Sequence, residues 1–400
     1  MQINLELNRR KLASLPLATA LILSLPSFVS AEPIRFVEQC SQFDVLSPAA
    51  QQTITALLQV AQTEDCQAAD RLLSTSPYLT LNNTQLSDLG VLATFPQLTE
   101  LYLEGNQIED LSPLAQLPNL QVLALGNNQI ADLSPLAQLT RLTQLHVNQN
   151  RIQTVQPLAS LVNLTELSLD DNAIQDLRPL AGLVKLTHLN LSRNQVATLA
   201  SLAALTSLQS LSLDSNQVAD VSPLASLANL TALRLDTNQI SSLSPLANLN
   251  SLLELDIDHN PVAPDQHLAI AQSVDLRRLA AKHVCQGCQL AGLDLSGGDF
   301  VGTYLAGANL SGTQLQTADL VGAYLENADL SHADLTDADL ESASLKGADL
   351  TGANLTGANL TGVNLEGANL EGAYLEETRL EEANLCNALL PGGQIGRCES

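Results

Sequence analysis

The sequence predicts a repeat protein made of two consecutive solenoids, and two repeat periods support this prediction. From Leu98 to Asn260 one pattern recurs every 22 residues, with an asparagine at the same place in each copy. From Leu290 to Leu390 an apolar residue stands at every fifth position. Self-similarity at a fixed period is the signature of stacked units that bury their apolar side chains against their neighbours. We therefore expect two stacked arrays in place of one globular core.

The 22-residue repeat predicts a short strand, a sharp turn and a short helical segment. Apolar residues such as Leu101 and Leu103 alternate with other residues, which indicates a strand with one buried face. An asparagine amide both donates and accepts, so a stacked column of asparagines can pair backbone groups that the turn hides from water. The proline of Ser112-Pro113-Leu114 suits the first turn of a short helix. The predicted structural column comprises Asn106, Asn128, Asn150, Asn172, Asn194, Asn216, Asn238 and Asn260.

The full pattern, L-x-x-L-x-L-x-x-N-x-I-x-D-L-x-P-L, resembles the bacterial, internalin-like class of leucine-rich repeats. The resemblance covers residues 78–262, with Thr84 in place of the asparagine in an early copy. It implies an α/β-type arc with a parallel inner sheet and short 3-10 or helical outer segments. It also implies that the inner sheet binds other macromolecules.

The five-residue period fits neither an α-helix nor a flat strand, but it fits a coil with a tight corner every five residues. Leucine and the alanine two positions before it would fill a narrow core, and glycines such as Gly352 and Gly357 would ease the corners. The motif A-[DN]-L-x-x, as in Ala353-Asn354-Leu355, resembles the pentapeptide-repeat family. That resemblance implies a right-handed quadrilateral β-helix over residues 289–390.

The first 31 residues are typical of an export signal. Arg9, Arg10 and Lys11 precede an apolar run, and Val29-Ser30-Ala31 fits a cleavage site. An uncleaved anchor is the alternative, but the run is short for a membrane span. We expect a mature chain that begins at Glu32, has no membrane span, and resides in the periplasm, on the cell surface, outside the cell or in a thylakoid lumen.

Three further segments are expected to close the arrays. Residues 32–77 predict a small helical N-terminal cap, which resembles the caps of exported cyanobacterial leucine-rich repeat proteins. Residues 263–288 predict a linker helix and cap, and residues 391–400 a C-terminal closure. An even number of cysteines in an exported chain predicts disulfides. The local pairs are Cys40 with Cys66, Cys285 with Cys288, and Cys386 with Cys398.

The Cys285-x-x-Cys288 pair has two alternatives to a structural bridge. A redox-active pair calls for a helix start within a βαβ unit, which the sequence does not predict. A zinc site calls for two further ligands, and only His283 is near in sequence. We therefore expect a bridge that closes the start of the second array, and no metal.

The outward columns of the inner sheet are not fixed by the fold and carry many charges. Carboxylates recur at successive repeats from Asp214 on, which favours a basic partner or Ca²⁺ bound through oxygen ligands. No compact D-x-D-x-D loop supports Ca²⁺, so a protein partner is favoured. The candidate partner-binding residues are Tyr102, Glu104, His146, Glu166, Asp170, Asp214, Arg234, Asp236, Glu254, Asp256 and Asp258.

No nucleophile, base and orienting acid recur at a recognisable spacing, so we expect no enzyme activity and no cofactor. The net charge of −25 opposes nucleic-acid binding. We expect an exported interaction or scaffold protein of undetermined oligomeric state, with the pentapeptide rod as a spacer or a second surface. The alternatives are a purely structural envelope or lumenal element and an acidic DNA mimic that inhibits gyrase. Resemblance to pentapeptide proteins suggests the mimic, and the export signal opposes it.

Overall fold

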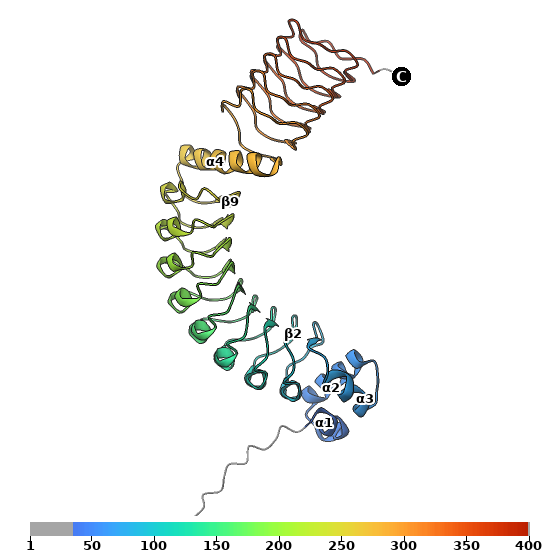
Figure 1. The fold of residues 1–400 in the computed structure, drawn as a ribbon, viewed down its shortest axis with the longest axis vertical. Helices are drawn as coiled ribbons and strands as arrows, with labels where there is room; N and C mark the ends of the chain where they lie inside the picture. Colours follow the sequence, from blue (N-terminus) through green and yellow to red (C-terminus); the bar gives the residue numbers. More distant parts are fainter. Residues whose placement is uncertain (1–34, 399–400) are drawn as a thin grey trace, which may run out of the picture. The chain divides into compact units, whose positions relative to one another are not determined.

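The structure is a computed structural model that describes residues 35–398. The predicted export signal, residues 1–31, lies outside the described residues. Three short helices are followed by an arc of strands and 3-10 segments, then by one longer helix and a stack of square coils (Figure 1). The predicted fold class of two solenoids with a helical N-terminal cap is confirmed.

The N-terminal cap consists of α1 (Phe36–Ser41), η1 (Phe43–Val45), α2 (Pro48–Ala61) and α3 (Cys66–Leu73). Helix α2 begins where the Ser47 side chain accepts a hydrogen bond from the Ala50 N–H, with proline in the first turn. Asp65 caps α3 by accepting from two N–H groups. Helix α1 was not predicted; it is only six residues long and has no side-chain cap. A disulfide between Cys40 and Cys66 joins it to α3.

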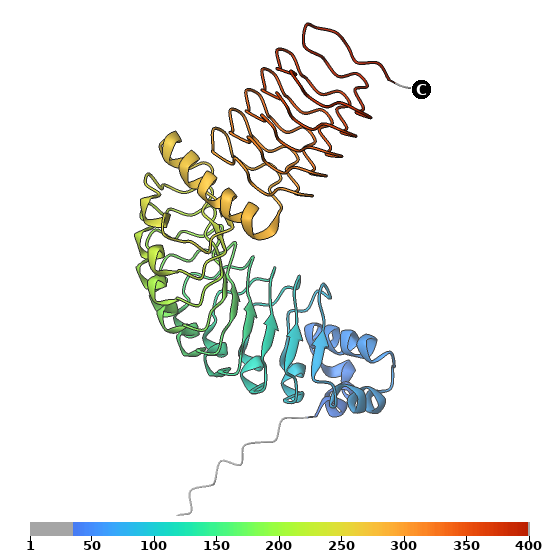
Figure 2. The ribbon, with the colours of Figure 1, turned by 45° about the horizontal axis from the view of Figure 1, so that its top comes forward.

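The inner side of the arc is a parallel sheet of nine strands in sequence order, β1 to β9 (Figure 2). Each strand pairs with the next at an offset of one repeat, as Leu101 does with Leu123. The central residue of each strand points into the core, while its neighbours face outward. The strands are Tyr78–Thr80, Glu100–Tyr102, Val122–Ala124, Gln144–His146, Glu166–Ser168, His188–Asn190, Ser210–Ser212, Ala232–Arg234 and Glu254–Asp256.

The outer side of the arc carries one 3-10 segment per repeat, η2 to η9 (Figure 1). In several repeats an aspartate before the segment pairs with its first N–H: Asp110 Oδ1, for example, accepts from the Ser112 N–H at 2.8 Å. The hydrogen bonds from Ser112 lower the pKa of Asp110. The segments are Gly90–Thr94, Ser112–Gln116, Ser134–Gln138, Gln156–Ser160, Arg178–Gly182, Ala200–Ala204, Ser222–Ser226 and Ser244–Leu246.

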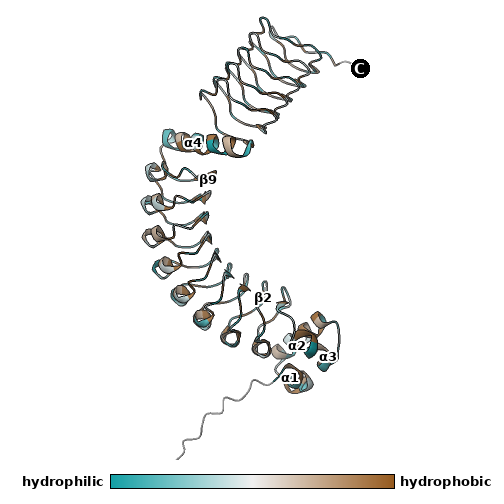
Figure 3. Cartoon of the chain, viewed as in Figure 1, coloured by the Kyte–Doolittle hydropathy of each residue, from teal (hydrophilic) through white to brown (hydrophobic). Residues whose placement is uncertain are grey.

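Helix α4 (Pro264–Lys282) covers the end of the leucine-rich array and contacts β9. Arg277 Nε donates to the Leu252 carbonyl of the last repeat, and Gln272 Nε2 donates to the Ala291 carbonyl of the first coil. Hydrophilic and hydrophobic residues both occur along the helix (Figure 3). Within residues 35–398, no helix is both long enough and apolar enough to cross a bilayer.

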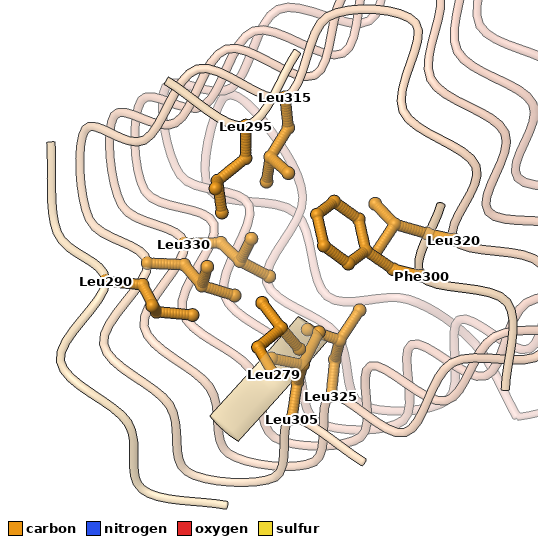
Figure 4. Close-up of a pocket in the computed structure, with 10 residues that line it drawn as sticks. Leu279, Leu290, Leu295, Phe300, Leu305, Leu315, Leu320, Leu325 and Leu330 are labelled. Atoms are coloured by element: carbon orange, nitrogen blue, oxygen red, sulfur yellow. The ribbon is translucent and has the colours of Figure 1, made fainter. Parts of the chain in front are cut away.

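The pentapeptide array stacks coils of twenty residues, so that Tyr304 pairs with Tyr324 and Asp319 with Asp339. Leucines and Phe300 point inward from the sides of the coil, and Leu279 of α4 covers the first layer (Figure 4). The space left among them is about 10 Å³, roughly one water molecule. Many corners have a positive φ, as at Gly352 (65°), which glycine adopts without the steric penalty of a side chain.

A short tail closes the far end of the stack. Residues Leu389 and Ile395 form an antiparallel bridge, and a disulfide joins Cys386 to Cys398. Both cysteines of the pair at the start of the stack, Cys285 and Cys288, are buried and bonded to each other.

Candidate functional site: the concave face of the leucine-rich array

The asparagine column lies beneath the concave face, and its side chains form hydrogen bonds with the backbone of the repeats. In a central repeat, Asn216 Nδ2 lies 2.9 Å from the Leu191 carbonyl and 3.0 Å from the Leu213 carbonyl. Its Oδ1 accepts from the Val196 N–H at 2.9 Å. The same bonds recur at each asparagine from Asn128 to Asn260, so each amide links its own turn to the preceding repeat. These side chains are occupied within the protein and offer little to a partner.

At the first repeats, the outward side chains bond mainly to one another. Tyr102 donates its hydroxyl to Glu100 Oε2 at 2.9 Å, and this hydrogen bond raises the pKa of Tyr102. Glu104 Oε2 accepts from Asn82 Nδ2 at 3.1 Å. The tyrosine ring is half-buried, and Tyr78 on the adjacent strand β1 presents a more exposed aromatic ring.

In the middle of the face, two candidate groups contact neighbouring side chains. His146 Nε2 lies 3.2 Å from Glu166 Oε1, but the two atoms are not aligned for a hydrogen bond. Asp170 is 9% exposed, because Arg193 Nη2 donates to it at 2.9 Å and the Ser168 hydroxyl at 2.8 Å. The carboxylate of Asp170 is therefore already matched within the protein, and its contact with a partner stays a prediction.

At the last repeats, most carboxylates have a partner of opposite charge or a hydrogen-bond donor. Asp214 accepts from the Asp236 N–H at 3.2 Å, yet burial raises the pKa of Asp214. His259 Nδ1 lies 2.7 Å from Asp236 Oδ1. This hydrogen bond lowers the pKa of Asp236 and raises that of His259. Glu254 pairs with Lys282 at 3.6 Å.

Two charged side chains on the same face have no such match. Arg234 of β8 and Asp256 of β9 stand opposite each other in register and are exposed. Within residues 35–398, neither side chain forms a hydrogen bond or an ion pair. Unmatched exposed charges on a rigid sheet are suited to electrostatic recognition of a partner.

A hollow that the sequence did not predict borders this end of the face. Its volume is about 590 Å³, and its walls come from β9, from α4 and from the first coil. Asp256, Asp258, His267 and Leu268 are among the residues that line it, and His267 Nε2 lies 3.3 Å from Asp258 Oδ1. The only sequence signal is the charged residues within an otherwise apolar helix, and their position depends on how α4 packs.

Two side chains in the wall of the hollow, Asp275 and Arg278, bond to other groups of the protein. Asp275 Oδ2 accepts from the Gln289 N–H at 2.7 Å, and Arg278 Nη2 lies 2.8 Å from both Asp275 Oδ1 and Cys288 Sγ. Burial raises the pKa of Asp275. Asp275, Cys285 and Cys288 are close enough to hold a metal ion, but the two sulfurs are joined in a disulfide and cannot act as thiolate ligands.

Two families match the repeats. The family described as "Leucine Rich repeats (2 copies)" matches residues 78–116, 118–160, 162–204 and 206–248. The family described as "Pentapeptide repeats (8 copies)" matches residues 284–320, 318–357 and 353–390. The comparison with curated proteins finds no match.

Solved structures similar to parts of the chain include internalins. Internalin C2 of Listeria monocytogenes is 37% identical, with 51% of this chain and 91% of that chain covered and a TM-score of 0.48. Internalin F of the same organism is 23% identical, with 72% and 93% covered and a TM-score of 0.49. A pentapeptide repeat protein from the cyanobacterium Cyanothece 51142 is 35% identical, with 28% and 94% covered and a TM-score of 0.23. The chain belongs to the leucine-rich repeat proteins, with repeats of the internalin-like type, and carries a pentapeptide-repeat array after them.

Proposed function

We propose that the chain is an exported, non-enzymatic recognition protein that binds a protein partner on its concave sheet. The observation that carries this proposal is the pair Arg234 and Asp256, two exposed and opposite charges on adjacent strands that form no ion pair within residues 35–398. Such charges steer association and select a partner of complementary charge. The leucine-rich repeat architecture supports a protein as that partner.

Export is supported by the cysteines. All six cysteines are in disulfides, which persist in oxidising compartments outside the cytosol. Periplasm, cell surface, medium and thylakoid lumen all fit this chemistry. In this proposal the pentapeptide array is a rigid spacer or a second contact surface. Helix α4 covers one end of the stack and the bridged tail covers the other, so its sides are the surface that a partner could contact.

The test is a cross-linking capture from extracts of the native cell, with variants chosen from the structure. Arg234→Glu reverses an exposed charge that forms no ion pair, and Tyr102→Ala removes a half-buried aromatic side chain near the other end of the sheet. Glu109→Lys is the matched control, because Glu109 is exposed and lies outside the strands. We expect the parent and Glu109→Lys to enrich the same few proteins and Arg234→Glu to lose them. Equal enrichment by Arg234→Glu would contradict the proposed face.

Capture of no specific protein by the parent chain would favour the second candidate, a structural element of the envelope or lumen. Capture of gyrase would instead favour the acidic DNA mimic and overturn the export proposal. Circular dichroism of each variant checks that the repeats remain folded.

A further inference from the structure

The hollow at the end of the concave face has walls of two kinds. Asp256 and Asp258 contribute carboxylates at its margin, and Leu268 and Val274 of α4 contribute apolar surface. A volume of about 590 Å³ lies within the range of ~300–1,000 Å³ that is usual for ligand pockets. A long basic side chain has the matching character, an aliphatic stem with a cationic end.

The charge within the hollow is negative where it is open. Asp275 and Arg278 form an ion pair in the inner wall and neutralise each other. Asp258 pairs with His267 at 3.3 Å, whereas Asp256 forms no ion pair within residues 35–398, although Arg234 stands beside it on the adjacent strand. Both carboxylates remain available to a cation that enters between them.

The same hollow contains an open edge of the sheet. In earlier repeats the residue after each strand donates its N–H to the following repeat: Leu213 N to the Arg234 carbonyl at 2.8 Å, and Leu235 N to the Asp256 carbonyl at 2.7 Å. The equivalent donor after β9 is Ile257, which has no acceptor among the described residues and lines the hollow. A free N–H at the edge of a sheet can pair with a carbonyl oxygen of an added extended segment, so a carbonyl oxygen placed here would gain a hydrogen bond.

We propose that this hollow receives an extended segment of the bound protein partner, with an arginine or lysine side chain between Asp256 and Asp258. The aliphatic stem of that side chain packs against Leu268, and a backbone carbonyl of the segment accepts the hydrogen bond from the Ile257 N–H. This inference rests on the proposed function, because it assigns an anchoring subsite to a partner that lies on the concave face.

A peptide fits this site better than a free polyamine or a metal ion. A polyamine has no carbonyl to accept from Ile257. A metal ion needs several ligand atoms close together, and the one such cluster within residues 35–398 is Asp275 with the bridged Cys285 and Cys288. The margin carboxylates are not part of that cluster.

The test is isothermal titration calorimetry of the mature, disulfide-bonded chain with acetyl-Gly-Arg-Gly-amide. Acetyl-Gly-citrulline-Gly-amide is the matched neutral probe, because citrulline keeps the shape and loses the charge. We expect the citrulline peptide to bind about tenfold more weakly or worse, which is typical for loss of a charge-assisted hydrogen bond. Asp256→Asn and Asp258→Asn should each weaken the arginine peptide to a similar degree. Glu109→Gln, at an exposed residue outside the strands, should leave it unchanged.

Three outcomes would overturn the inference: no binding of the arginine peptide at concentrations of about 10 mM, equal binding of the citrulline peptide, or full binding by Asp256→Asn. Tighter binding of spermidine than of the arginine peptide would also overturn it, in favour of a polyamine site. The capture experiment distinguishes the two proposals, since Arg234 lies outside the hollow. Peptide binding without capture of a protein contradicts only the proposed function, and capture without peptide binding contradicts only the subsite.

Discussion

Replacing Asn216 by alanine tests whether the asparagine column holds the leucine-rich array together. The alanine removes the only acceptor of the Val196 N–H, which lies in a sealed turn. The Leu191 and Leu213 carbonyls each lose one donor but keep another, from Asn194 and Asn238 respectively. One orphaned buried donor costs ~1–3 kcal/mol, and two lost hydrogen bonds add ~1 kcal/mol each. We expect a loss of about 3–5 kcal/mol in the free energy of unfolding.

The measurement is urea denaturation followed by far-ultraviolet circular dichroism, with the change in stability taken from the midpoint. Asn229→Ala is the matched control, because its exposed amide makes a single bond, to the Thr206 carbonyl. That control should lose about 1 kcal/mol or less. If Asn216→Ala is no less stable than Asn229→Ala, the argument that the column pairs otherwise orphaned backbone groups is refuted.

Three further predictions concern the cap, the last repeats and the compartment. Replacing both Cys40 and Cys66 by serine removes a cross-link across 26 positions, and we expect a loss of about 3–4 kcal/mol from the loop-closure entropy of the unfolded chain; a double variant as stable as its parent would contradict this. The His259–Asp236 pair should stabilise the fold most between the ordinary pKa values of 3.8 for aspartate and 6.5 for histidine. Its contribution is lost as the pH rises through the raised pKa of His259 and as it falls through the lowered pKa of Asp236, so the stability difference between the parent and His259→Gln should vanish at both extremes. The intact mass of the protein from native cells should correspond to a chain that begins at Glu32 and lacks six hydrogens, whereas a full-length reduced chain would contradict export.

The acidity of the chain has several separate causes. Many aspartates of the outer side cap 3-10 segments, as Asp110 and Asp132 do with their serines. In the pentapeptide array, aspartates such as Asp349 accept from the N–H two residues on and stabilise the corner that follows. A high count of carboxylates therefore says little about binding, and only those without an internal partner are informative.

The sequence alone was sufficient to predict both arrays, because each repeat contacts its neighbours at a fixed offset. The period places Leu101 against Leu123 and Asn216 beneath Val196, and these contacts follow from spacing without further information. The core of the pentapeptide stack follows in the same way, since every fifth residue enters one narrow interior. The short α1 escaped prediction because six residues without a side-chain cap leave little periodic signal.

Only the tertiary structure decided which charges of the concave face remain free. Asp170 and Asp256 both occupy outward positions, but Arg193 folds back onto Asp170, whereas Asp256 is exposed and its side chain forms no hydrogen bond or ion pair within residues 35–398. The hollow depends on the packing of α4 between the last strand and the first coil, which brings His267 to Asp258. The contacts between repeats are set by the spacing of residues along the chain. The pairing of charges depends instead on side-chain direction and on contacts at the end of the leucine-rich repeats.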